Sequence, residues 1–392
     1  TQDQENIMMS RRHNELPDDR ISYPADAPRR IRRIGCAAVI ALGAIWLGGC
    51  GGHRPPPGDG PLARGMEIFR HDTFGDEILW SDTLRMHEVI GSSVDPLTAL
   101  SVGLKVDRDA LPEGVLDALA AGKIDLSDPA TTVALIKLDA VVGIRGTVTS
   151  VDGRDTLTRV GITCALCHST VDDSVAKGVG KRLDGWPNRD LDPGAIIALS
   201  PALDDTAKAA YRSWGKGRFD PRHNIDGKSS PVLIPPAYGL KGIHRITYTG
   251  DGEEIAYWNR YVAVAEMGGQ GSVTEPRLNL SITNGTDDLV SSKLPDLQAY
   301  QLSLKAPPPP AGSFDVAAAV RGKRLFEGRA GCAGCHAGPL FTDANTRLHL
   351  PGDSMAEPEA TSYAARSATG LYRTTPLRGA WQHPPYFHDG SA

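Results

Sequence analysis

The sequence predicts a mainly helical chain built from two related domains, the first of which contains a long insertion. Three kinds of segment occur twice and in the same order: an Arg-Gly helix segment, a Cys-x-x-Cys-His signature and a Pro-rich segment that ends in Asp-Gly. The copies lie at residues 63–75 and 320–331, 164–168 and 332–336, and 229–252 and 374–390. Repeated order of this kind indicates duplication of a structural unit.

The helix segments place an apolar residue and Phe at helical spacing after Arg-Gly in both copies. In the second copy this helix runs almost directly into Cys332, whereas residues 70–160 intervene in the first copy. This insertion predicts helices over 111–122 and 127–139, each with Pro near its start. Two β-rich runs then flank Asp152-Gly153, which is a hairpin signal.

The domain limits follow from Pro-rich segments. Residues 297–315 read as a helix that gives way to four prolines, which is typical of a semi-rigid linker. We therefore expect a first domain at 62–306, a linker at 307–312 and a second domain at 313–392. The first domain includes the insertion.

The N-terminal segment, residues 1–49, has the pattern of an export signal. Four arginines within Arg29–Arg33 precede an apolar run of 14 residues, which is shorter than the roughly 20 that a membrane-spanning helix needs. The run ends in Leu-Gly-Gly-Cys, which resembles a bacterial lipobox with Cys50 as the lipidated residue. Residues 50–61 then form a Gly/Pro tether. These features predict a lipid-anchored protein on the periplasmic side of a bacterial membrane.

The positions of the cysteines limit the kinds of site that the chain can form. Of six cysteines, Cys36 falls in the predicted signal peptide and Cys50 is the lipidation candidate, so four remain in the two signatures. Zinc could be bound by two Cys-x-x-Cys pairs, and a single pair could act as a redox dithiol. Covalent haem attachment requires the same pair followed directly by His, and both copies have it.

The His after each pair favours haem over the other two interpretations. Two Cys at i and i+3 lie on nearly the same face of a helical turn, so both sulfurs reach the haem vinyl groups. The adjoining His168 or His336 then supplies the iron ligand. We expect two c-type haems, attached through Cys164, Cys167, Cys332 and Cys335. A net charge of −5 with no basic block argues against nucleic acid as a partner.

The run TTPLRGAWQHPPYFHDGS, at 374–391, closely resembles the segment after the second haem site in bacterial diheme cytochrome c peroxidases and MauG-like enzymes. The lead-in to Cys332 resembles the same family, and the resemblance covers roughly residues 161–392. It implies two cytochrome c-like haem domains. The sequence stops at Ala392, where family members continue with a helix that supplies a haem ligand, so we expect the second domain to be truncated.

The resemblance also implies catalytic candidates. Glu266 stands where the family has its acidic residue and is expected to move protons, with Gln270 on the next turn. Tyr248 and Trp258 are candidates for relaying electrons between haems, or else core residues. Met267 is either an iron ligand or apolar filling, and the latter is favoured.

Further candidates surround the irons. His223 and His244 are candidates for the distal ligand of the first haem, and Met355 is a candidate for that of the second. The alternative for each histidine is an ordinary surface or hydrogen-bonding role, and the alternative for Met355 is an ordinary loop position. Arg378 is expected to pair with a haem propionate. His388 is expected to organise the haem surroundings rather than to bind iron.

The function that the resemblance implies is reduction of hydrogen peroxide at the N-terminal haem, with electrons passed through the C-terminal haem. The alternatives are a non-catalytic diheme electron-transfer lipoprotein and an oxidase of an organic or protein substrate. A small redox protein or a quinol-linked cytochrome is the expected electron donor, and calcium is a further cofactor candidate by resemblance.

Overall fold

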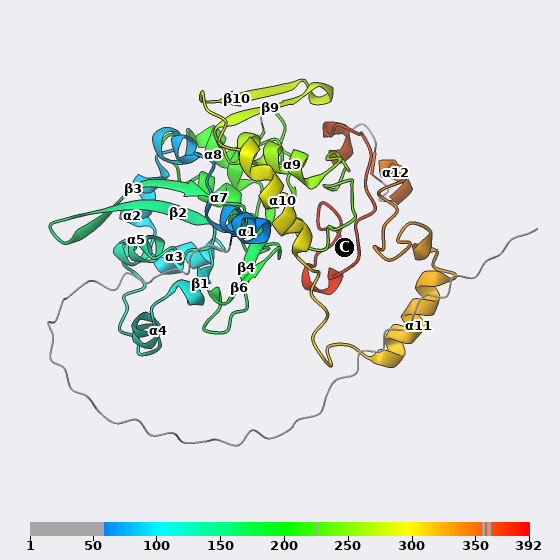
Figure 1. Ribbon diagram of the computed structural model, residues 1–392, viewed down its shortest axis with the longest axis horizontal. Helices are drawn as coiled ribbons and strands as arrows, with labels where there is room; N and C mark the ends of the chain where they lie inside the picture. The colour runs from blue at the N-terminus through cyan, green and yellow to red at the C-terminus, as the bar shows by residue number, and fades with distance from the viewer. Residues whose placement is uncertain (1–58, 225, 355–356, 359–361) are drawn as a thin grey trace, which may run out of the picture. The chain divides into compact units, whose positions relative to one another are not determined.

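The computed structural model describes residues 59–224, 226–354, 357–358 and 362–392. Helix α1 (Pro61–His71) packs along helix α10 (Leu294–Ser303) (Figure 1). Gly65 permits this close approach, since a Cβ there would lie 2.0 Å from the carbonyl oxygen of Asp296. Phe69 and Leu297 fill the interface and belong to the larger hydrophobic core. The two ends of the first domain therefore pack together.

The insertion folds into helices and a hairpin with a second core of its own. Asp128 caps helix α5 by accepting a hydrogen bond from Ala130 N, as Asp at an N-cap position does. Asp152 and Gly153 both have positive φ, which is the requirement of a tight two-residue hairpin turn. The elements are η1 (Ile78–Thr83), α2 (Met86–Ser93), α3 (Pro96–Ser101), β1 (Val106–Asp107), α4 (Glu113–Ala120), α5 (Pro129–Lys137), β2 (Ile144–Val151) and β3 (Arg154–Ile162).

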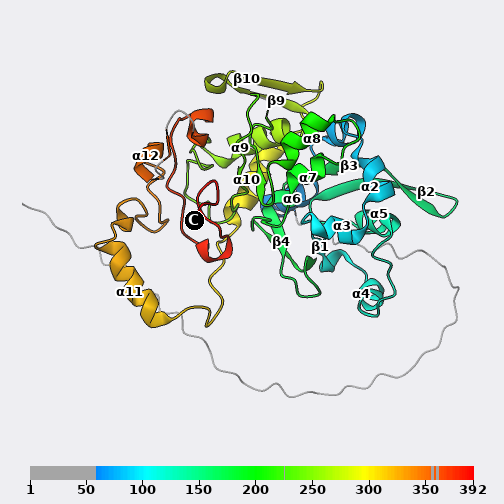
Figure 2. The same ribbon diagram turned by 180° about the vertical axis from the view of Figure 1, so that it is seen from behind.

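The remainder of the first domain consists of short elements. Helix α6 (Ala165–His168), which contacts α1 and β4, contains the first signature (Figure 2). The π-helical turn η3 continues directly from α9. The elements after α6 are β4 (Ser169–Val171), β5 (Val179–Gly180), β6 (Arg182–Asp184), α7 (Pro193–Ile197), α8 (Asp205–Arg212), β7 (Arg218–Phe219), β8 (Val232–Leu233), α9 (Ile255–Tyr261), η3 (Val262–Glu266), β9 (Gly271–Glu275) and β10 (Leu280–Asn284).

All sheets in the described part have two strands. The pairs β2–β3, β4–β6, β7–β8 and β9–β10 are antiparallel, and β1–β5 is parallel. None of these sheets forms a layer of the fold, so helices and loops set the positions of the functional side chains.

The C-terminal part contains little regular structure. Helix α11 (Val316–Glu327) leads to a 3₁₀ turn, η6 (Cys332–Gly334), and the short helix α12 (Pro351–Ser354) follows. The final residues return to the first domain, where Leu233 N donates a hydrogen bond to the carbonyl of His388.

The local predictions are confirmed, but the class is more mixed than expected. Both Arg-Gly segments are helices, the insertion contains the two helices and the hairpin, and a helix precedes the four prolines. Of the described residues, 37% are helical and 14% are in strands, and residues from 59 on belong to a single compact unit. Duplication of two haem domains therefore stays a prediction.

The predicted signal peptide and Cys50 lie outside the described residues, as do Cys36 and most of the tether. Among the described residues, the search for helices with the length and hydropathy of a membrane span finds none.

Candidate functional site

A large cavity, lined by residues between 80 and 301 and by Tyr363, gathers most of the residues that the sequence singled out. The space between its walls totals about 1350 Å³, part of it open to solvent, and only about 140 Å³ can hold the centre of a water molecule. Its walls are largely apolar, and they include Cys164, Cys167, His168, His223, Tyr248, Trp258, Glu266 and Met267.

The imidazole of His168 is held in one orientation. Its Nδ1 lies 3.1 Å from the carbonyl oxygen of Pro235. Because a carbonyl only accepts, Nδ1 has to be the protonated nitrogen and Nε2 keeps its lone pair. Burial also lowers the pKa of His168 to about 4, so the ring is neutral at physiological pH. A neutral imidazole with a free Nε2 is the form that binds a metal ion.

The two cysteines of the first signature are free thiols that line the same cavity. Burial raises the pKa of Cys164 and of Cys167 to about 12. Redox-active dithiols need a lowered thiol pKa and partial exposure, so the site does not suit dithiol exchange. His168 N donates to the carbonyl of Cys164 at 3.1 Å, which confirms the helical turn expected for the signature.

His223 lies in the cavity wall on an irregular segment. Its φ of 45° is left-handed, and its ring packs edge-on against Trp214 at a centroid distance of 5.4 Å. Burial lowers the pKa of His223 to about 4, while the nearby Asp220 opposes this shift. The ring is therefore neutral and can offer a nitrogen to a ligand in the cavity.

Glu266 places a carboxyl group in the cavity wall without a counter-charge. Its Oε1 is buried and has no hydrogen-bond partner among the described residues. Burial raises the pKa of Glu266 well above its ordinary value of 4.5, and the charge of Asp220 acts in the same direction. A carboxyl group that stays protonated and lacks a protein partner is suited to exchange a proton with a small molecule in the cavity.

Gln270 does not join Glu266, contrary to the expectation that it follows on the next helical turn. The π-helical turn ends at Glu266, and Gly268, with a φ of 86°, redirects the chain. Gln270 is therefore buried against Gly75 and Gly285 and is not part of the cavity wall. A catalytic role for Gln270 has no support in the geometry.

Tyr248 and Trp258 both line the cavity, as an electron-relay role requires. The indole of Trp258 stacks on Tyr261 with centroids 4.8 Å apart. Burial raises the pKa of Tyr248, and the charge of Arg189 partly opposes this rise. Both residues also pack against hydrophobic clusters, so a core role remains compatible with their positions.

Two half-buried arginines beside Tyr248, Arg189 and Arg373, were missed by the sequence analysis. Two guanidinium nitrogens of Arg189, Nε and one terminal nitrogen, are buried and have no hydrogen-bond partner in the described structure. The same is true of Nε of Arg373. Neither forms an ion pair with a described carboxylate within 4 Å. Burial lowers the pKa of Arg373 to about 10. Neither arginine is part of the cavity wall, but both lie next to Tyr248, which is.

Arg378, the predicted propionate partner, is instead exposed and outside the cavity wall. Arg373, which directly precedes this motif, is half-buried and leaves its Nε without a hydrogen-bond partner in the described structure, but it is also outside the cavity wall.

The other predicted residues have varied positions. His388 is buried between the rings of Tyr363 and Tyr372 and is outside the cavity wall, which fits an organising role. His244 is exposed and hydrogen-bonded through its main chain to Asn345, so it is not near the cavity. Met355 lies outside the described residues.

The second signature repeats the histidine geometry of the first. His336 Nδ1 lies 3.1 Å from the carbonyl oxygen of Phe341, and His336 N donates to the carbonyl of Cys332 at 2.9 Å. The ring packs beside Phe326 of α11, at a centroid distance of 6.4 Å. Unlike His168, His336 is in an exposed setting.

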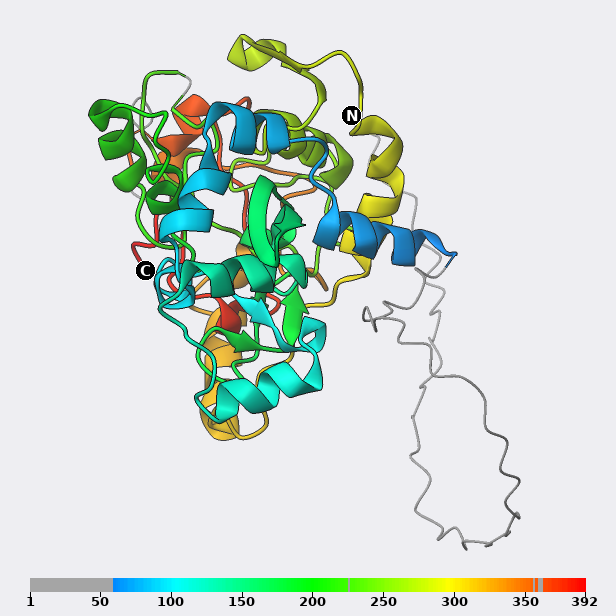
Figure 3. The same cartoon turned by 90° about the vertical axis from the view of Figure 1, so that its left-hand side faces the viewer.

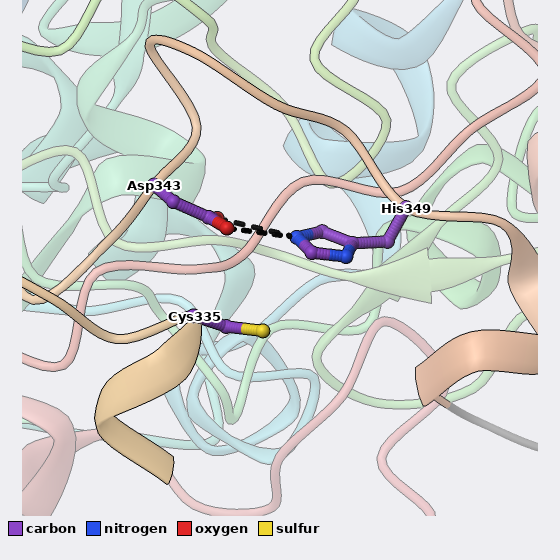
Figure 4. Close-up of side chains that lie close together, drawn as sticks. All are labelled: Cys335, Asp343 and His349. Carbon is purple, nitrogen blue, oxygen red and sulfur yellow. Dashed lines mark hydrogen bonds and ion pairs between the residues drawn. The ribbon is translucent and has the colours of Figure 1, made fainter. Parts of the chain in front are cut away.

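Cys335, Asp343 and His349 converge near this second signature (Figure 4). Their ligand atoms lie within 4.8 Å of one another, and His349 Nε2 is 3.1 Å from an oxygen of Asp343. Among the described residues, they form the only group of three or more potential ligands found. The four signature cysteines therefore do not converge on one zinc site in the described structure. Thiolate and imidazole are poor calcium ligands, so calcium stays a prediction.

The first site fits a c-type haem by the chemistry of its donors. It combines paired thiols, an imidazole with a free Nε2 and largely apolar walls, and two half-buried arginines lie beside its Tyr248. Comparison with known proteins gave no match for this chain with a protein family, a curated protein or a solved structure.

Proposed function

We propose that the protein is a diheme c-type oxidoreductase that reduces hydrogen peroxide at its first site. One observation supports this most: the Cys-x-x-Cys-His signature shares a cavity with an unpartnered, protonated carboxyl group, Glu266. A pure electron-transfer protein needs no proton donor beside its cofactor. The second signature, whose Cys332, Cys335 and His336 are half-buried, is accessible enough to receive electrons from a small redox protein or a quinol-linked cytochrome.

Each residue of the first site has a defined part in this proposal. Cys164 and Cys167 would hold the haem covalently, and His168 Nε2 would bind its iron. Arg189 and Arg373 would satisfy its two carboxylates. When bound, the iron supplies the binding site for peroxide and the electrons that cleave the O–O bond.

The chain itself controls protons and water. Glu266 would donate its proton to the departing peroxide oxygen, which leaves as water, and would take up the proton of the other peroxide oxygen, which restores its protonated form. The apolar walls keep bulk water out and thereby hold the carboxyl group in its protonated resting form. His223, neutral and in the same wall, is the candidate for a displaceable ligand.

Haem attachment is the first test. The exported full-length protein is expected to contain two covalent haems, measured by intact mass and by haem absorbance after denaturation. The double change Cys164→Ala with Cys167→Ala should leave one haem, and Cys332→Ala with Cys335→Ala should leave the other.

The alternative at the second signature is a metal ion bound by Cys335, Asp343 and His349. Recovery of a single haem together with stoichiometric zinc would assign this group to metal binding and would remove the diheme proposal. Protein without covalent haem at either signature would overturn it entirely.

Charge removal near the first haem gives a second test. Arg373→Met is expected to lower the midpoint potential of the first haem, because a nearby positive charge favours the reduced form. Arg378→Met, on the exposed arginine of the motif that follows Arg373, is the matched control and should change the potential less. Spectroelectrochemical titration measures both values, and a larger change in the control would restore Arg378 as the propionate partner.

A further inference from the structure

Helices α3, α4 and α5 of the insertion lie close together (Figure 3). A second cavity lies between these helices and residues 175–179, which follow the insertion. It encloses about 660 Å³ in which the centre of a water molecule can lie. For scale, an engineered cavity of about 150 Å³ is enough to bind benzene. Space of this size among packed helices is large enough for an extended ligand.

The lining of this cavity is aliphatic. Only three of its 21 lining residues have polar side chains, namely Thr131, Thr132 and Lys177, and none is aromatic. The hydroxyl of Thr131 is already used, since it donates to the carbonyl of Asp125. Leu, Val, Ile, Ala and Pro side chains offer no stacking surface, so the lining favours a flexible hydrocarbon chain over a planar ring.

The hydroxyl of Thr132 is an unsatisfied polar group in this wall. Thr132 is 3% exposed, and its Oγ1 has no hydrogen-bond partner among the described residues. A buried hydroxyl without a partner is costly, and such groups in native proteins usually meet a partner or an ordered molecule. A ligand with a polar atom would satisfy it.

Lys177 provides the only charge in the lining. Its side chain is exposed, and within the described structure no carboxylate lies within 4 Å of its ammonium group. Its charge helps to lower the pKa of Asp190, but it is one of the smaller causes of that shift. An ammonium group at the edge of an aliphatic cavity is positioned to attract an anionic headgroup.

We propose that the insertion and residues 175–179 together bind a long-chain fatty acid, with its hydrocarbon chain in this cavity and its carboxylate toward Lys177. The inference rests on cavity size, aliphatic lining, the free ammonium group and the unpartnered hydroxyl. It does not depend on haem binding or on peroxide chemistry, and it gives the insertion a ligand of its own.

Calorimetric titration of the full-length holoprotein with octanoate, decanoate and dodecanoate, each below its micelle concentration, tests the proposal. Each added pair of methylenes should tighten binding about tenfold, because burial of one CH₂ contributes about 0.8 kcal/mol. Affinity that is independent of chain length, or no dodecanoate binding at 100 μM, would overturn it.

Variants locate the binding site. Ala130→Trp and Val115→Trp fill the cavity from α5 and α4 and should weaken dodecanoate binding at least tenfold. Leu97→Trp, on an exposed residue outside the lining, is the control and should bind as the unmodified protein does. Equal loss in the control would place the fatty acid elsewhere.

Headgroup recognition is tested separately. Lys177→Ala should weaken dodecanoate about threefold and leave dodecanol unchanged, since an exposed ion pair contributes modestly. Lys123→Ala, an exposed lysine outside the lining, is its control. Thr132→Val should weaken dodecanoate about fivefold. Preference for dodecanol, or for a naphthoquinone over dodecanoate, would contradict a carboxylate ligand.

Discussion

Glu266→Gln is expected to reduce peroxide turnover by at least about 100-fold, because general acid–base catalysis contributes ~10²–10⁴-fold. Glutamine keeps the size of the side chain and its place in the cavity wall, but it cannot exchange a proton with peroxide. Turnover is measured with a reduced small cytochrome as electron donor, at saturating peroxide.

Glu253→Gln is the matched control, because Glu253 is an exposed carboxylate outside the cavity wall and its loss should leave turnover unchanged. The haem content of both variants is measured first, so that a loss of cofactor is not read as a loss of catalysis. Full activity in Glu266→Gln would remove this residue from the mechanism.

Glu266 also affects stability in a pH-dependent way. Its pKa is raised on folding, so above pH 4.5 the folded state holds a proton that the unfolded state releases. Folding stability therefore falls as pH rises through this window, by up to ~1.36 kcal/mol per pH unit. Glu266→Gln lacks this contribution. The thermal midpoint of the variant should therefore rise, relative to that of the unmodified protein, as pH increases from 5 to 8. Parallel curves would show that Glu266 is ionised in the fold.

Arg366→Met is expected to lower the free energy of unfolding by about 3–5 kcal/mol, the usual effect of removing one partner of a buried ion pair. Arg366 binds Asp220 at 3.1 Å and Asp226 at 2.8 Å, and thereby joins the C-terminal segment to the first domain. Asp220 is fully buried, so loss of the arginine leaves an uncompensated charge. Chemical denaturation at pH 7 measures the effect.

Arg64→Met is the control for this measurement. Arg64 also pairs with an aspartate distant in sequence, Asp296, but the arginine is about half exposed and the pair is open to solvent. Its loss should therefore change stability far less. Asp226 adds a milder variant, because Asp226→Asn removes one of the two carboxylates and keeps Asp220 paired. If Arg366→Met and Arg64→Met had equal effects, the link between segments would not depend on the buried pair.

Local structure could be predicted from sequence wherever a few neighbouring residues determine it. Asp152-Gly153 fixed the hairpin because the turn needs positive φ at both positions, and Pro129 marked a helix start. The cavity around His168 was also foreseeable in part, since the signature and Glu266 were recognised from their motifs. These features depend on residues that are close together in the chain.

The rest depended on tertiary contacts that no local pattern encodes. Arg189 and Arg378 look alike in sequence, and only the fold buries the first and exposes the second. Gln270 was misplaced because a glycine with positive φ redirects the chain after the π-helical turn. Thr132 reads as an ordinary helix residue until the neighbouring helices leave its hydroxyl without a partner.

The hydrogen bond between His168 and Pro235 has an evolutionary consequence. Its acceptor is a main-chain carbonyl, so no exchange of the side chain at position 235 deletes the oxygen. Pro236 follows directly, and its fixed φ limits how far that peptide can rotate. The imidazole orientation is therefore robust to most point mutations there but vulnerable to a one-residue insertion or deletion. Sequence drift around this turn should alter residue types freely while its length stays constant.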